Sequence, residues 1–302
     1  MTVVPVFGPD SNGRFVGPLT GLKLSRVKGY GNVELSNPAS SGVAIVPLHM
    51  GYIQDGAQNH ALCRSAFIAA GQKRMFNDAC CVQAAQGGYL EGREQWFFIL
   101  PVQLRNEALE RRGQVGYNKI WDSISQLNRE FGLRGRGHLE QIISRSRAML
   151  TQYRSRFELM QGQTGALFFI REKLAGVEIA PTASYFQEMW MPLVCFAYGV
   201  AAMSVEKRER TNDEEIRPFE ARTLLELREK LRISRLEQRE EVGGWLAHTP
   251  PEQFKFQEEE RYVDLKLHTV AGVNFAGQVV EEDGKLLYAS LFAKPQYLQA
   301  VG

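Results

Sequence analysis

The stretch Phe275-Ala-Gly-Gln-Val-Val-Glu-Glu-Asp-Gly-Lys-Leu-Leu-Tyr-Ala-Ser-Leu-Phe292 decides the fold. It holds two runs of strand composition, 275–280 and 285–292, around an Asp283-Gly284 pair. Asp-Gly between such runs is a strong hairpin signal, because both residues tolerate the positive φ of a tight turn. The sequence therefore predicts an antiparallel hairpin here, preceded by another strand over 263–268, where apolar and polar residues alternate.

More strands are predicted earlier in the chain. Segments 165–171 and 174–180 flank a short turn and are expected to pair as a second hairpin. Before residue 101, short apolar runs alternate with turn residues. The runs are 43–48, 61–70, 79–84 and 95–100, and the turns are 29–32, 55–56 and 87–88. This portion is expected to be a small antiparallel unit, a sandwich or a strongly curled sheet.

Helices are expected between these strand groups. Apolar residues recur at helical spacing after Pro101, around Ile120 to Leu127, and over 139–160 and 184–204. The 139–160 helix carries an arginine face, made of Arg145, Arg147, Arg154 and Arg156. More than half of residues 206–241 are charged, with one thin apolar stripe of Leu224, Leu227, Leu231 and Leu236. That pattern predicts a solvated helix, or a helical pair, packed by one narrow seam.

Strands on both sides of the helices indicate an α+β fold with a curled, sandwich-like antiparallel β core. We expect residues 1–302 to form one interwoven domain, with helical excursions at about 102–160 and 206–255.

Composition narrows the function further. The chain has 302 residues and a formal net charge of +2, too small for bulk attraction to nucleic acid or an anionic membrane. Glu140 and Glu158 reduce the positive charge of the arginine-bearing helix, which argues against a nucleic-acid interface. The N-terminus lacks the pattern of a signal peptide, and the longest apolar run, 189–203, is too short to cross a bilayer. We expect a cytoplasmic protein without a membrane partner.

Neither a metal nor a cofactor is predicted. The five histidines show no ligand spacing, and there is no C-x-x-C pair. Cys80 and Cys81 would point to opposite faces of a strand and cannot hold one metal together. Glycine-rich nucleotide loops and a G-x-S-x-G elbow are also missing from the sequence. The four cysteines are expected to be buried and reduced.

The most unusual stretch is Gly56-Ala-Gln-Asn-His-Ala-Leu-Cys-Arg-Ser65. A turn would deliver Gln58, Asn59 and His60 together, and Arg64 would share a strand face with His60. With Gln83 beside them, these groups could bind a phosphate, a ribose or a carboxylate. The alternative is that the two amides only complete a bulged turn and that the arginine is a surface residue.

Two residues are candidates for catalysis. His60 could act as a base and Cys81 as a nucleophile, provided that the two approach each other or share a cavity. The alternative for Cys81 is a buried, unreactive thiol.

Three blocks, within 56–104, 162–203 and 276–294, resemble in their order and spacing the family of ARG-and-rhodanese-phosphatase-superfamily-associated proteins. The resemblance covers about two thirds of the chain and leaves out 206–255. The family is named for genes beside ADP-ribosylglycohydrolases and rhodanese-like phosphatases, which implies a link to NAD or ADP-ribose metabolism. The family pattern has an arginine where this chain has His60, and often a carboxylate where it has Gln83. If the family's chemistry needs that carboxylate as a general base, this chain has lost it, because glutamine cannot accept a proton at neutral pH. These departures from the family pattern favour binding over catalysis here.

Three functional hypotheses follow. The first is a ligand-binding or accessory protein linked to nucleotide, NAD or ADP-ribose metabolism, with a nucleotide-like small molecule as its partner. The second is a hydrolase acting on such a nucleotide. The third is an assembly subunit that uses 206–255 to bind a second copy or another protein.

Overall fold

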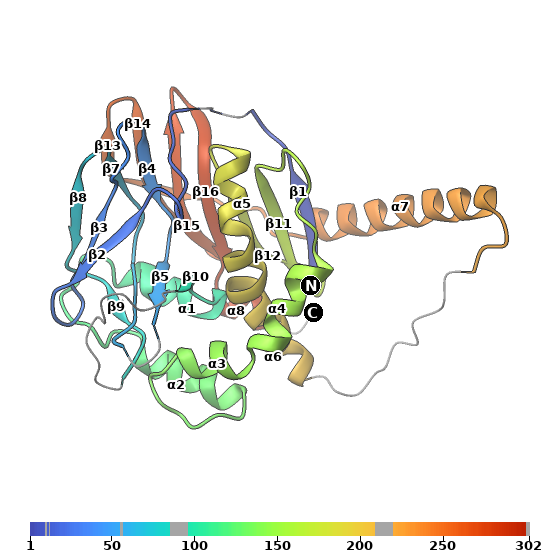
Figure 1. Cartoon of the computed structure of the whole chain (residues 1–302). Helices are drawn as coiled ribbons and strands as arrows, with labels where there is room; N and C mark the ends of the chain where they lie inside the picture. The colour runs from blue at the N-terminus through green and yellow to red at the C-terminus, as the bar shows by residue number, and fades with distance from the viewer. Residues whose placement is uncertain (10, 12, 55–56, 85–95, 209–219, 300–302) are drawn as a thin grey trace.

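The computed structural model describes residues 1–9, 11, 13–54, 57–84, 96–208 and 220–299 (Figure 1). The predicted turns at 55–56 and 87–88 lie outside these ranges. The fold is α+β, as the sequence predicts, and every pair of neighbouring strands in the described sheets is antiparallel.

The largest sheet has seven strands in the order β1-β11-β12-β16-β15-β14-β13. Their bounds are Thr2–Val6 for β1, Gly165–Ile170 for β11, Lys173–Ile179 for β12, Lys255–Tyr262 for β13, Leu265–Ala271 for β14, Phe275–Glu282 for β15 and Lys285–Ala293 for β16. Both predicted hairpins are confirmed, as β11–β12 and β15–β16. Asp283 and Gly284 have positive φ values of 49° and 75°, as the tight turn requires.

Strand β13 was not predicted, because its sequence is mostly charged. It lies at the edge of the sheet, where one side of a strand faces water and charged side chains are tolerated. Three glutamates of this strand are in ion pairs: Glu258 with Arg261, Glu259 with Arg112 and Glu260 with Arg74.

Three smaller sheets lie beside the β13–β15 end of the large sheet (Figure 1). They contain β2 (Lys23–Val27), β3 (Val33–Ser36) and β8 (Lys73–Phe76); β4 (Val43–Val46) and β7 (Ala66–Ala69); and β10 (Trp96–Ile99), β5 (Met50–Ile53), β6 (His60–Ala61) and β9 (Cys80–Cys81). The Ser65 amide donates to Gln278 Oε1 at 2.7 Å, and the rings of Phe67 and Tyr262 lie 6.0 Å apart. These contacts join the small sheets to the large one.

The predicted strand over 61–70 is wrong in one respect that affects the site. The chain leaves the ladder after Ala61 and re-enters a different sheet at Ala66. His60 and Arg64 therefore do not share the face of one strand.

The helical excursion over 102–160 contains α1 (Val102–Glu110), α2 (Trp121–Glu130), α3 (Glu140–Arg145) and α4 (Arg147–Arg156). The single helix predicted over 139–160 is thus divided at Ser146. The predicted helix over 184–204 is present as α5 (Ala183–Met191), a π-helical turn η1 (Pro192–Ala197) and α6 (Tyr198–Arg208). Pro192 has no N–H to continue the regular ladder, which accounts for the wider turn there.

Residues Ala183–Glu206 form a helix long and apolar enough to cross a membrane, but 83% of its apolar window is buried inside the fold. Such burial is typical of the core helix of a soluble protein. One hydrophobic cluster extends from Leu22 to Phe292 and includes this helix, the inner face of the large sheet and α1.

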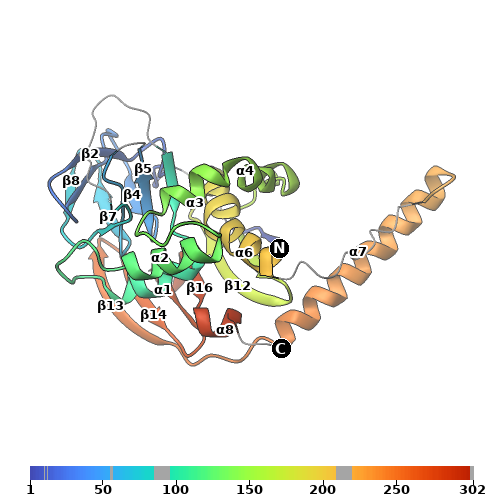
Figure 2. The ribbon, with the colours of Figure 1, turned by 90° about the horizontal axis from the view of Figure 1, so that it is seen from below.

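The charged segment forms one long helix, α7 (Leu224–Ala247), followed later by the short α8 (Pro295–Gln299). The predicted packed seam is wrong, since no residue of α7 is buried and Leu224 and Leu225 are 85% and 81% exposed. Among the described residues, the C-terminal end of α7 is the part that packs against the body, through Val242 and Trp245, which contact the cluster around Phe169. The rest of the helix projects from the body in both views (Figures 1 and 2).

Candidate functional site

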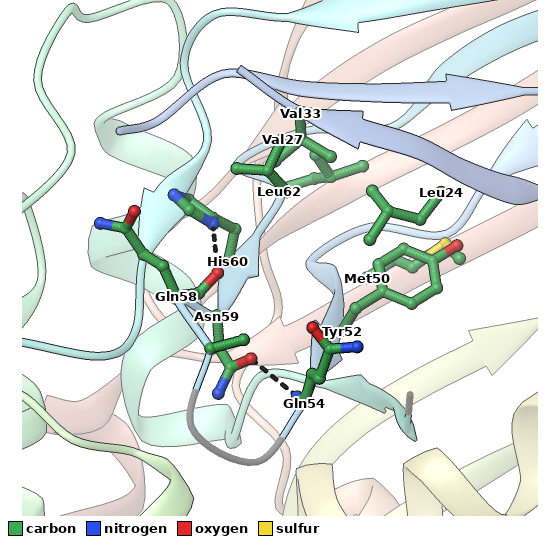
Figure 3. Close-up of a pocket in the computed structure, with 11 residues that line it drawn as sticks. Leu24, Val27, Val33, Met50, Tyr52, Gln54, Gln58, Asn59, His60 and Leu62 are labelled. Atoms are coloured by element: carbon green, nitrogen blue, oxygen red, sulfur yellow. Dashed lines mark hydrogen bonds between the residues drawn. The ribbon is translucent and has the colours of Figure 1, made fainter. Parts of the chain in front are cut away.

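The predicted polar turn forms one wall of a small cavity between the β2–β3 hairpin and strand β5 (Figure 3). Gln54, Gln58, Asn59 and His60 supply its polar atoms, and Leu24, Val27, Val33, Met50, Tyr52, Ala57 and Leu62 complete the lining. The free space is about 20 Å³, which holds about one water molecule and excludes a nucleotide.

Both ring nitrogens of His60 form hydrogen bonds with backbone groups. Its Nδ1–H donates to the Gln58 carbonyl at 3.0 Å, and Nε2 accepts from the Gly31 amide at 3.1 Å. Burial lowers the pKa of His60 to about 4, although the bond to Gln58 opposes this shift. The imidazole is therefore neutral at pH 7, and its lone pair already holds a backbone N–H.

Cys81 lies opposite His60, because β6 and β9 pair in the register His60↔Cys81. The Cys81 thiol donates instead to the Gln83 carbonyl at 3.1 Å and accepts from Gln58 Nε2 at 3.7 Å. Burial raises the pKa of Cys81, which favours the thiol over the nucleophilic thiolate. The two catalytic candidates are neighbours, but each is bonded to other groups.

Asn59 and Tyr52 carry unused hydrogen-bonding groups at this cavity. Asn59 Oδ1 accepts from the Gln54 amide at 2.7 Å, whereas its Nδ2 and the Tyr52 hydroxyl have no partner among the described residues. Buried polar atoms are normally satisfied, so these two donors are open to a water or a ligand oxygen.

Arg64 and Gln83 do not line the cavity. Arg64 Nε donates to Asp78 Oδ2 at 3.1 Å, and this carboxylate also accepts from the Gly113 amide. Gln83 forms an isolated backbone bridge with His138. The structure thus groups Gln58, Asn59 and His60, and places the other two predicted ligand residues elsewhere.

A much larger cleft of about 1,020 Å³ adjoins the cavity, and Leu24 and Tyr52 line both. Strands β2, β5 and β10 form one side of the cleft, and α4, α5 and η1 form the other. Besides the two shared residues, its lining includes Lys23, Trp96, Phe97, Arg147, Thr151, Arg154, Glu158, Glu188, Trp190 and Phe196.

Two arginines of α4 dominate the polar wall of the cleft. The guanidinium carbon of Arg147 lies 3.6 Å from the centroid of the Trp96 ring. Arg154 follows seven residues later, two turns along the same face and about 10 Å away along the axis. Within the described ranges neither arginine is in an ion pair. The acidic Glu188 is occupied, since it accepts from the amides of Leu19 and Thr20.

Residues 1–299 match the ARG and Rhodanese-Phosphatase-superfamily-associated Protein domain. The chain belongs to this family. The match is longer than the two thirds inferred from sequence blocks, and it spans the charged segment 206–255 that the blocks left out. No curated protein and no solved structure matches. The function of this family member is therefore inferred from the cavity and the adjoining cleft.

Sequence reasoning missed the most deeply buried charged group of this family member. The Arg105 side chain is fully buried and donates to Glu178 Oε1 at 2.7 Å, to the Tyr198 hydroxyl at 3.3 Å and to His49 Nδ1 at 3.2 Å. Its only sequence signal is an arginine at the core-facing positions of an otherwise apolar helical stripe. The network does not line the cavity or the cleft described above, and its buried charge pair joins α1 to β12, which indicates a structural role.

Proposed function

We propose that this protein binds a nucleotide-like phosphate ligand, of the ADP-ribose or NAD class, in the cleft beside the polar turn. On this proposal it is an accessory protein of nucleotide metabolism in the cytoplasm. The observation that carries the proposal is the stack of Arg147 on Trp96 at the wall of a cleft that also holds Arg154.

This arrangement suits a phosphate. A guanidinium stacked on an indole is held in orientation through its face, while its N–H edge stays free for in-plane, bidentate bonds to phosphate oxygens. Arg154, about 10 Å along the axis of α4, supplies a second positive charge on the same wall of the cleft.

The rest of the cleft suits the organic part of such a ligand. Trp96, Trp190 and Phe196 supply aromatic surface, and the volume is at the upper end of small-molecule sites. At the inner end, the Tyr52 hydroxyl, which has no partner among the described residues, is a donor for a ribose or carbonyl oxygen.

Binding is favoured over hydrolysis by the state of the two catalytic candidates. A general base needs an accessible lone pair, and that of His60 is bonded to the Gly31 amide. Position 83 holds an amide, and the Cys81 thiol is buried with a raised pKa. A hydrolase would require these groups to rearrange.

A thermal-shift screen with ADP-ribose, NAD, nucleoside phosphates and inorganic phosphate tests the proposal. We expect one organic phosphate to raise the melting temperature by several degrees, with the rise lost in Arg147→Gln. Arg145→Gln is the matched control, because Arg145 lies on α3, is exposed and does not line the cleft. A rise that survives both Arg147→Gln and Arg154→Gln would show that the ligand does not bind at the arginine wall of the cleft. No rise with any ligand would contradict the proposal.

A second candidate function, assembly, is favoured by α7. Its projecting part exposes Leu224, Leu225 and Leu231, and large apolar side chains gathered on one element mark interaction surfaces. Size-exclusion chromatography with light scattering tests this function. A multimer that becomes a monomer in Leu224→Glu/Leu231→Glu supports assembly through α7, whereas a monomeric wild type counts against self-association.

A further inference from the structure

Two cysteines lie in sulfur–sulfur contact beside the polar turn. The Sγ atoms of Cys63 and Cys80 are 2.9 Å apart, and both residues are fully buried. The register Ala61↔Cys80 between β6 and β9 sets this contact, since Cys63 follows two residues after Ala61. Cys81, next in sequence, donates to the Gln83 carbonyl instead.

A lysine connects the pair to the surface. The half-buried Lys119 Nζ lies 3.9 Å from Cys63 Sγ and donates to the carbonyls of Asp78 and Gln114 at 2.8 Å each. An ammonium beside a sulfur stabilises negative charge on it, which the attacking sulfur in thiol oxidation must carry. The hydrogen bond with Cys63 and burial raise the pKa of Cys80 well above its usual value, which favours the thiol form of Cys80.

We propose that Cys63 and Cys80 are a site of oxidation by a small hydroperoxide, which converts them to an intrachain disulfide. Cys63 loses its proton and its sulfur attacks one peroxide oxygen, so that an S–O bond forms, the O–O bond breaks and the departing hydroxide takes up the proton from Cys63 to become water. Cys80 sulfur then attacks Cys63 sulfur. The S–S bond forms, the S–O bond breaks, and the leaving hydroxide takes the Cys80 proton as a second water. The two thiols lose two electrons, and one hydrogen peroxide gains them.

Because both sulfur atoms are buried, the size of the oxidant matters. Both thiols are fully buried and the half-buried Lys119 lies beside Cys63, which favours a small hydroperoxide over a bulky disulfide as the oxidant. The bond would tie β9 to the segment after β6, across a sequence separation of 17 residues. Closing a loop of that length restricts the unfolded chain, and we expect the melting temperature to rise by about 5 °C.

The test uses the full-length protein treated with hydrogen peroxide, then denatured and alkylated. We expect four alkylated cysteines before treatment and two afterwards, with a mass loss of about 2 Da from two hydrogens. Tryptic mapping should join the peptide containing Cys63 to the peptide containing Cys80, and fragment ions should assign the bond to Cys80 rather than Cys81.

Three variants complete the test. Cys195→Ser should still form the bond, because Cys195 is outside the pair, and Cys63→Ser should retain all its remaining thiols. Lys119→Met should slow the reaction at least several-fold while leaving the final product unchanged. Peroxide treatment that leaves Cys63 and Cys80 alkylatable, joins other cysteines or gives only intermolecular dimers would overturn the proposal. The peptide map of the wild type shows whether the Cys63–Cys80 bond forms even if a cysteine variant fails to fold.

Discussion

Replacing Glu178 by glutamine is expected to lower the free energy of unfolding by about 3–5 kcal/mol. The substitution keeps the size of the side chain and one acceptor oxygen, but removes the only negative charge within hydrogen-bonding distance of Arg105 in the described structure. The Arg105 side chain is fully buried, and burial by itself lowers its pKa, but the neighbouring Glu178 carboxylate and the other groups of the network raise the pKa above its ordinary value. It cannot lose its proton, so the charge would remain in the core without a counter-ion.

Urea unfolding followed by tryptophan fluorescence measures this effect. The matched control is Glu226→Gln on α7, which removes an exposed ion pair with Lys230 and should leave the unfolding midpoint nearly unchanged. A double variant, Arg105→Met/Glu178→Leu, should recover much of the lost stability, because it removes both buried charges. A decrease below about 1 kcal/mol in Glu178→Gln would refute the reasoning that Arg105 depends on this carboxylate.

Three further predictions concern stability. Because the folded-state pKa of His60 is lowered to about 4, the neutral ring contributes stability above pH 6.5 that is lost as the pH falls toward 4. The loss should reach about 3 kcal/mol, and His60→Gln should show a smaller decrease over this window in urea unfolding at stepped pH. Gly176→Ala should destabilise the fold by about 1–3 kcal/mol, because an added Cβ would lie 2.0 Å from the Tyr198 hydroxyl. Gly243→Ala is the control: an added Cβ there meets open space on α7, so this substitution should stabilise the fold by up to about 1 kcal/mol. Trp245→Ala should release the anchored end of α7 from Phe169, 5.6 Å away between ring centroids. Hydrogen exchange should then increase in α7 and stay unchanged in β15 and β16, and increased exchange in those strands would contradict this account.

The fold could be predicted wherever local sequence determines structure. The Asp283-Gly284 turn and the 165–180 hairpin are fixed by residues adjacent in the chain, and both were located correctly. Strand β13 was missed because its charged residues are neutralised by Arg74, Arg112 and Arg261, two of which are distant in sequence. The apolar stripe of α7 predicts a packed seam that the structure does not have, because periodicity shows which residues share a face and not whether another element covers that face.

In the candidate site, too, contacts between residues close in sequence could be predicted, whereas contacts between distant residues could not. Gln58, Asn59 and His60 cluster because they are adjacent in one turn, and the sequence is sufficient to predict that turn. The pairing of Arg64 with Asp78 and the stacking of Arg147 on Trp96 join residues 14 and 51 positions apart, and no local pattern indicates such contacts. The arginine face of α4 was recognised, but its aromatic partner was not.

Isothermal titration of ADP-ribose into the wild type, Arg147→Gln and Arg145→Gln tests the central claim most directly. We predict saturable binding to the wild type and to Arg145→Gln, and at least about tenfold weaker binding to Arg147→Gln, because a lost charge-assisted hydrogen bond costs about 1.5–3 kcal/mol. Equal affinity in all three proteins would contradict the claim that the cleft beside Trp96 holds the phosphate.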